Sequence, residues 1–270
     1  MNLLSMLTTR IPVRRALAAI SLSTVGAFAV AADLPQFTLN PVAAGLVGAS
    51  FSGDNILISN YSVVTSTGGT FTDRGFLAIS SIQSGGATST PGGLNSTYGM
   101  YIAFEGSGTA STVNPTTTPT FGSFTSLTYT LFGYNGTAAF GFSGNTPTET
   151  ATGEVVLATG SLVNGSVSTI PTGDGSYTPS AAAKLTFNVA AGQSTFFSAP
   201  NPFFNSAFAA FTNTVSQVDA FDGGFRIRQG GGAFNFVPLV PIPEPESYAL
   251  MLAGLIGLGA LRSAKRRRSL

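Results

Sequence analysis

Short runs in which apolar and polar residues alternate recur along most of the chain, separated by glycine, asparagine and threonine. In LTFNV, residues 185–189, every second residue is apolar. In FRIRQ, residues 225–229, two arginines share the polar face, and residues 125–131 place leucine and tyrosine on one side. A period of two is typical of a strand with one buried face. The pattern therefore predicts many short, half-buried strands.

Further alternating runs raise the expected total to about ten strands, spaced roughly 10–20 residues apart. These runs cover residues 55–64, 76–82, 100–104, 138–142, 154–157 and 232–237. Threonine, valine, tyrosine and phenylalanine, which favour strands, are frequent in them. The sequence thus predicts a mainly β single domain, either an antiparallel β-sandwich or a barrel, and the pattern leaves both open.

One segment has a different period. Phe204, Phe208 and Phe211 are four and three positions apart, which is the spacing of one helical face. Pro202 suits the first turn of a helix. We therefore expect one short helix over residues 202–212, packed on the sheet. Its phenylalanines are interpreted as core residues rather than as an exposed platform for sugars, because buried aromatic side chains are the commoner case.

The first 32 residues have the layout of a secretory signal peptide. A basic stretch ends at Arg15, an apolar stretch extends from Ala16 to about Val30, and the small residues Ala31 and Ala32 follow. This layout predicts export, with cleavage after Ala31 or Ala32. The alternative, an uncleaved anchor, has less support because serine, threonine and glycine interrupt the apolar stretch.

The last thirty residues, PIPEPESYALMLAGLIGLGALRSAKRRRSL, combine three features in a fixed order. The Pro243-Glu244-Pro245 motif precedes an apolar run, Tyr248–Leu261. The chain then ends in a basic cluster formed by Arg262, Lys265, Arg266, Arg267 and Arg268. A helix over the apolar run is about 21 Å long, shorter than the hydrocarbon core of about 30 Å. The basic cluster is expected to stay on the cytoplasmic side, so the tail is predicted to hold the chain at the membrane only transiently.

This tail resembles the PEP-CTERM sorting signal of Gram-negative bacteria, which the membrane transpeptidase exosortase reads. The resemblance implies that Pro243, Glu244 and Pro245 form the recognition motif. It divides the chain into a signal peptide (1–32), a β-rich secreted domain (33–237) and a sorting tail (238–270). It also implies passage through the Sec translocon, transient anchoring in the inner membrane, and a final location at the cell surface or in the extracellular matrix. A permanent single-pass anchor is the alternative.

The composition excludes several kinds of chemistry. The chain has no cysteine and no histidine, which excludes disulfides, thiolate and imidazole metal sites, and catalytic triads that use histidine. Between Asp33 and Ile242 there are nine acidic and four basic residues, a net charge of −5. Such a body offers no basic stripe for nucleic acid. We therefore expect no cofactor, no metal ion and no nucleic-acid partner.

Carboxylates are the remaining candidates for chemistry in the body. They are Asp33, Asp54, Asp73, Glu105, Glu149, Glu154, Asp174, Asp219 and Asp222. A glycoside hydrolase needs two carboxylates about 5–10 Å apart in a cleft, and the sequence singles out no pair. Asp174 and Asp222 each precede a glycine and predict turns. Asp219 and Asp222 are a weak alternative candidate for calcium, because their spacing matches no calcium loop.

The body carries a second resemblance. The segments DNILISNYSVVT, GLNSTYGMYIAFEGSGT, SLTYTLFGYNGTAAFGF and FRIRQGGGAFNF are similar to those of the flocculation-associated PEP-CTERM proteins. This resemblance implies a non-enzymatic secreted protein that holds cells in flocs together with exopolysaccharide. The alternatives are a carbohydrate-binding module and a carboxylate-based glycoside hydrolase. The first alternative requires an exposed face shared by tyrosines such as Tyr98, Tyr101, Tyr129, Tyr134 and Tyr177.

Overall fold

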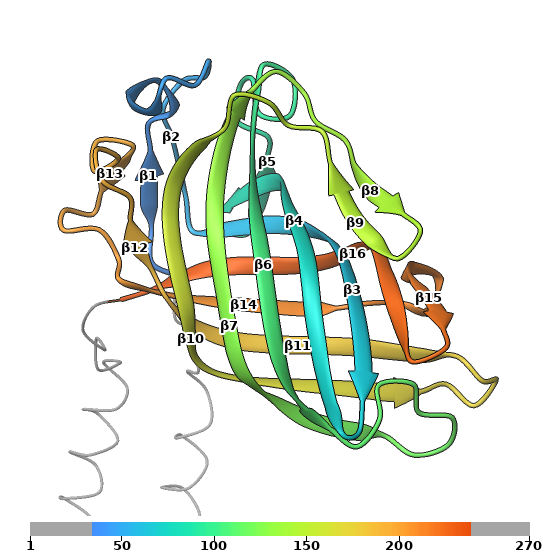
Figure 1. Ribbon diagram of the computed structural model, residues 1–270. Coiled ribbons are helices and arrows are strands. Elements are labelled where there is room, and N and C mark those ends of the chain that lie inside the picture. Colours follow the sequence, from blue (N-terminus) through green and yellow to red (C-terminus); the bar gives the residue numbers. More distant parts are fainter. Residues whose placement is uncertain (1–33, 239–270) are drawn as a thin grey trace, which may run out of the picture. The chain divides into compact units, whose positions relative to one another are not determined.

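The computed structural model describes residues 34–238, which form a mainly β domain around an eight-stranded antiparallel barrel (Figure 1). The barrel strands are β3 (Asn55–Thr67), β4 (Thr70–Ser84), β6 (Tyr98–Ala110), β7 (Thr120–Asn135), β10 (Val155–Pro171), β11 (Tyr177–Thr186), β14 (Ser206–Thr212) and β16 (Gly224–Val237). Each strand pairs with its neighbours in this order, and β16 pairs with β3, so the sheet closes on itself. Of the two architectures left open by the sequence, the barrel is the one that forms.

Several elements predicted from the sequence lie outside the described residues. They are the signal peptide with Ala31 and Ala32, the Pro243-Glu244-Pro245 motif, the apolar run and the basic cluster. Within residues 34–238, no helix is long and apolar enough to span a membrane.

Side chains alternate between the interior and the exterior along each barrel strand, as expected for a closed sheet. In β7, Leu127, Tyr129 and Leu131 are buried while the residues between them are more exposed. In β16, Phe225 and Ile227 are buried and Arg228 is exposed. These inward and outward faces are the ones that the alternating pattern predicted.

The run at residues 185–189 also buries its apolar positions. Leu185 ends the inward face of β11, and Phe187 is buried between β11 and the short strand β12 (Asn188–Val189). Asn188 is exposed, as predicted, while Val189 is only partly buried.

The predicted helix over residues 202–212 is wrong, because this segment contains the barrel strand β14. Its backbone pairs with β11 on one side and β16 on the other. Ala207 and Ala209 face the interior and are buried, whereas Phe208 is 40% exposed on the outside. Phe204 precedes the strand and is buried with other phenylalanines. The spacing of four and three residues therefore grouped phenylalanines that do not share a face.

Inward glycines make room for interior aromatic rings on adjacent strands. A Cβ on Gly160 of β10 would collide with the ring of Tyr129, which lies on the neighbouring strand β7. The ring of Phe71 likewise occupies the space beside Gly108. Large and small residues thus interdigitate across the barrel wall, which is how a narrow barrel is filled without strain.

One end of the barrel, here named the plugged end, is closed by phenylalanine side chains. Its outer layer is the three-stranded sheet of β1 (Phe37–Leu39), β2 (Phe51–Gly53) and β13 (Phe197–Ala199), on the left in Figure 1, with the 3₁₀ helix η1 (Pro41–Ala44) nearby. Beneath it, Phe187 packs against Phe197 and Phe236 with ring centroids 5.2 and 5.0 Å apart. Such edge-on aromatic pairs stabilise a core beyond the area that they bury.

The remaining strands and 3₁₀ helix are additions to the barrel. Strands β5 (Ala87–Ser89), β12 and β15 (Val218–Phe221) each add to one barrel strand, and η2 (Val215–Gln217) precedes β15. The hairpin of β8 (Phe140–Ser143) and β9 (Thr146–Glu149) lies on the outer face, at the upper right in Figure 1. There Phe140 contacts Tyr61 and Tyr101, with ring centroids 5.8 and 5.4 Å apart. The hairpin thereby covers aromatic side chains that point out of the barrel.

Replacing Phe187 with alanine should lower the free energy of unfolding by about 3–5 kcal/mol, because the ring is fully buried among other rings. Phe208→Ala is the matched control, since its ring points outward from β14; it should cost less than about 1 kcal/mol. Urea unfolding of both variants measures the difference. A large loss for Phe208→Ala would contradict the outward placement of that ring.

Candidate functional site

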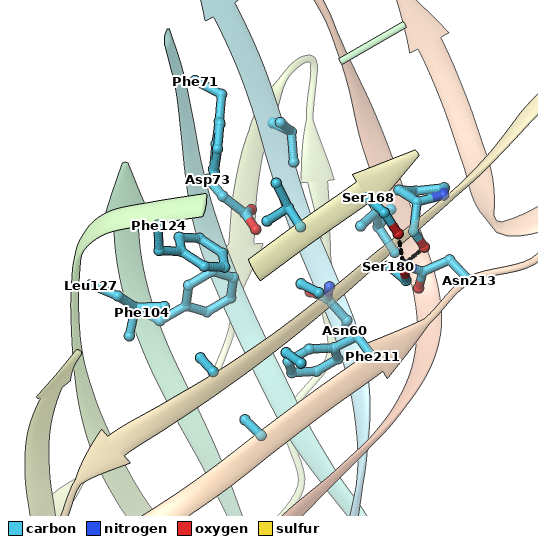
Figure 2. A pocket seen from close by; sticks show the side chains of 18 of the residues that line it. Asn60, Phe71, Asp73, Phe104, Phe124, Leu127, Ser168, Ser180, Phe211 and Asn213 are labelled. Atoms are coloured by element: carbon cyan, nitrogen blue, oxygen red, sulfur yellow. Dashed lines mark hydrogen bonds between the residues drawn. The ribbon is translucent and has the colours of Figure 1, made fainter. Parts of the chain in front are cut away.

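The half of the barrel away from the plugged end contains a cavity of about 80 Å³ (Figure 2). We name this half the loop end, because the β3–β4 turn and the loop 111–119 lie there. Side chains from all of the barrel strands line the cavity. Most of them are apolar or aromatic, and they include Phe71, Leu77, Phe104, Phe124, Leu127, Tyr129, Phe211 and Phe234. An apolar chamber with a few polar groups is the usual form of a small-molecule site.

Asp73 on β4 is the one carboxylate on the described wall of this cavity. It is 8% exposed, and its neighbours across the sheet are Val64 and Gly106, which offer no donor side chain. Oδ1 of Asp73 has no hydrogen-bond partner. Burial raises the pKa of Asp73 to about 7, against a smaller opposing effect of the Ser62 hydroxyl. Asp73 is therefore a desolvated acid that titrates near neutral pH.

Two buried amides add unpaired oxygens to the same cavity. Asn60 on β3 is 3% exposed and Asn213, after β14, is 2% exposed. The side-chain NH₂ of Asn213 donates to the Pro179 carbonyl over 3.0 Å, which fixes its orientation. Its Oδ1 occupies the space that a Cβ of Gly230 would fill, and Gly230 is the cross-strand partner of Asn60. Neither Asn60 Oδ1 nor Asn213 Oδ1 has a hydrogen-bond partner.

Three hydroxyl groups of the cavity wall differ from these oxygens because each takes part in a hydrogen bond. Ser168 and Ser180, on adjacent strands, share a hydrogen bond of 2.7 Å (Figure 2). Tyr129 donates its hydroxyl hydrogen to the Thr186 carbonyl over 2.8 Å. The unpaired oxygens of Asp73, Asn60 and Asn213 are, by contrast, hydrogen-bond acceptors once the carboxyl is ionised. A guest that donates hydrogen bonds would therefore complement these acceptors.

Asn114 fastens the loop 111–119 over the loop end. Its Oδ1 accepts a hydrogen bond from the Tyr177 hydroxyl over 2.9 Å. Its NH₂ group donates to the carbonyls of Phe221 and Gly224 over 3.2 and 3.1 Å. Val113, the preceding residue, is buried and lines the cavity. The loop therefore forms part of the cavity wall as well as a cover.

The turn predictions for Asp174 and Asp222 are confirmed. Asp174 accepts hydrogen bonds from the Thr172 hydroxyl over 2.7 Å and the Ser176 amide over 3.0 Å, and these bonds lower its pKa. Asp222 lies exposed in the turn between β15 and β16. Asp219 lies 2.7 Å from Arg228 and 3.5 Å from Arg226, so its oxygens already face two guanidinium groups.

The other carboxylates of the described residues lie away from the cavity. Asp54 accepts a hydrogen bond from the Gly85 amide at a turn. Glu105 is exposed on the outer face opposite Arg74. Burial raises the pKa of Tyr101, and Glu149 and Glu154 raise it further; Glu154 accepts a hydrogen bond of 2.7 Å from the Tyr101 hydroxyl. These two carboxylates thus converge on a buried tyrosine beside the β8–β9 hairpin.

The five tyrosines proposed for a sugar platform are all buried. Their exposed fractions are 0% for Tyr98, 3% for Tyr101, 4% for Tyr129, 2% for Tyr134 and 5% for Tyr177. They therefore form no exposed aromatic face. Among residues 34–238, no group of three or more acidic side chains is placed to hold a metal ion.

Asp73 was one of nine candidate acids and was not singled out from the sequence, and Asn60 and Asn213 were not predicted. A usable signal was present in the strand pattern. In β3 and β4, Asn60 and Asp73 stand at positions that alternation assigns to the interior. A polar residue in the apolar phase of a strand indicates a buried polar group.

No family model, curated protein or solved structure matches this chain.

The raised pKa of Asp73 makes the stability of the domain depend on pH. The unfolded carboxyl has a pKa of about 3.9, and the folded one titrates near 7. Between these values the folded state binds the extra proton, so stability should fall as pH rises from about 4 to about 7 and then level off. The full loss corresponds to about 4 kcal/mol at most.

Asp73→Asn, which keeps the shape and removes the charge, should abolish this loss and be more stable than wild type at pH 8. Asp222→Asn, on the exposed turn, should keep the wild-type pH dependence. Urea unfolding at several pH values measures both variants. An unchanged pH dependence in Asp73→Asn would show that this carboxyl is not desolvated in the folded state.

Proposed function

We propose that this chain is a non-enzymatic, exported protein of the cell surface or extracellular matrix of a Gram-negative bacterium. In this proposal, exosortase recognises the Pro243-Glu244-Pro245 motif of a PEP-CTERM tail and the mature domain promotes flocculation together with exopolysaccharide. The observation that carries the proposal is the order of motif, apolar run and basic cluster within the last thirty residues.

The geometry of the domain is compatible with removal of such a tail. Phe37 near the start of the domain and Phe236 near its end lie side by side, with ring centroids 5.2 Å apart. Both chain ends of the described domain therefore lie at the plugged end. The last barrel strand, β16, ends at Val237, before the proposed motif begins. Cleavage after the motif would remove no strand of the barrel.

The outer face of the barrel offers groups that suit a neutral polysaccharide. Thr65 and Thr72 share a hydrogen bond of 2.8 Å between β3 and β4, and Ser107 and Ser126 do the same between β6 and β7. Thr72 and Ser107 are cross-strand partners, so these hydroxyls form one row across the sheet. Hydroxyl groups both donate and accept hydrogen bonds, as sugar hydroxyls do. This row supports the proposed association with exopolysaccharide.

Changing Glu244 to alanine keeps the apolar run and the basic cluster, so membrane insertion should survive while recognition by exosortase fails. The variant should accumulate as a longer species in the inner membrane, and cells that carry only this variant should lose flocs with exopolysaccharide output unchanged. Glu246→Ala, outside the motif, is the matched control. Mass spectrometry of the C-terminus in each cell fraction decides. Wild-type protein that still ends at Leu270 in its final location would contradict the proposal.

A further inference from the structure

We propose that the barrel cavity at the loop end is a binding site for a small apolar molecule that carries an amine. This function is independent of the proposed role in flocculation. It rests on the unpaired oxygens of the cavity, the sign of its charge, and its size and walls.

The unpaired oxygens determine which kind of head group the cavity accepts. Asp73, Asn60 and Asn213 are each more than nine-tenths buried, line the cavity, and have an oxygen without a partner. A buried acceptor without a donor destabilises the folded state, and several such groups in one chamber are unusual in a native fold. A guest whose N–H donors reach these oxygens would relieve this destabilisation. A carboxylate or a ketone, which only accept hydrogen bonds, would not.

The charge of the cavity favours a cationic donor. Asp73 is the only acid among the described lining residues, and these include no lysine or arginine. Arg74, the next residue on β4, and Glu105 on the neighbouring strand β6 are exposed on the outer face. Tyr129, the other titratable group on the wall, has its hydroxyl bonded to Thr186, and burial raises its pKa. An ammonium group next to Asp73 would therefore meet one uncompensated carboxylate.

The size and walls of the cavity define the rest of the ligand. Because one water needs roughly 10–15 Å³ of such space, a cavity of about 80 Å³ holds about five to eight non-hydrogen atoms. Phe71, Phe124 and Phe211 lie on its walls, as Figure 2 shows. Aromatic rings favour a flat apolar body and also attract an ammonium group through their faces.

Benzylamine is a suitable probe, and benzyl alcohol, toluene and benzoate are matched analogues that change only the head group. We expect benzylamine to bind the full chain and to raise its melting temperature. Benzyl alcohol should bind about tenfold more weakly, since a neutral hydrogen bond replaces a charge-assisted one. Toluene and benzoate should not bind measurably. Isothermal titration calorimetry gives the affinities.

Two further measurements test the role of Asp73. Asp73→Asn should bind benzylamine about tenfold more weakly and lose the preference over benzyl alcohol, while Asp222→Asn should bind as wild type does. Circular dichroism checks that both variants are folded. In the wild type, benzylamine affinity should rise from pH 5.5 to pH 8 as Asp73 loses its proton. The proposal is wrong if benzylamine does not bind, if toluene binds as tightly, or if Asp73→Asn retains the wild-type preference and affinity.

Discussion

Pairing of the first barrel strand, β3, with the last, β16, is the interaction on which the rest of the structure depends. It gives every barrel strand two partners, so that no edge of the barrel is left open for pairing with another chain. Closure with eight strands also sets an interior just wide enough for side chains to fill. Phenylalanines fill the plugged end, and the loop that Asn114 fastens covers the other. The cavity is the space that this filling leaves.

The sequence predicted the strands whose inward residues are large and apolar, and it failed where they are small. Leu127–Leu131 and Phe225–Ile227 alternate clearly, and their faces were assigned correctly. Strand β10 was expected to end at Leu157 but continues to Pro171. The continuation was missed at Gly160, because this glycine leaves its interior space to the Tyr129 ring and gives no apolar signal. The helix predicted over residues 202–212 was wrong for the same reason. The inward residues of β14 include Ala207 and Ala209, whose small side chains give little apolar signal. Choosing a barrel over a sandwich required the β3–β16 pairing, which no local pattern reveals.

The cavity and the exterior of the barrel have different chemistry. Outside, hydroxyl groups such as those of Thr65 and Thr72 pair across the strands, and these are the groups that we propose associate with exopolysaccharide. Inside, Asp73 and Asn60 stand where alternation normally places apolar residues, Asn213 follows β14, and each of the three leaves an acceptor unpaired. Folding energy alone does not favour such residues, because burial without a partner destabilises the domain. A guest that donates hydrogen bonds is the physical reason we give for their presence.

The most direct measurement of this account is the titration of the Asp73 carboxyl by carbon-13 NMR in the folded domain. A closed barrel that holds this carboxyl away from water, with only the smaller opposing effect of the Ser62 hydroxyl, predicts a midpoint near pH 7. The resonance is assigned by comparison with Asp73→Asn, in which it is absent. A midpoint in the ordinary range for aspartate, about 3.9, would mean that water or a donor reaches the carboxyl, and would contradict the desolvated cavity.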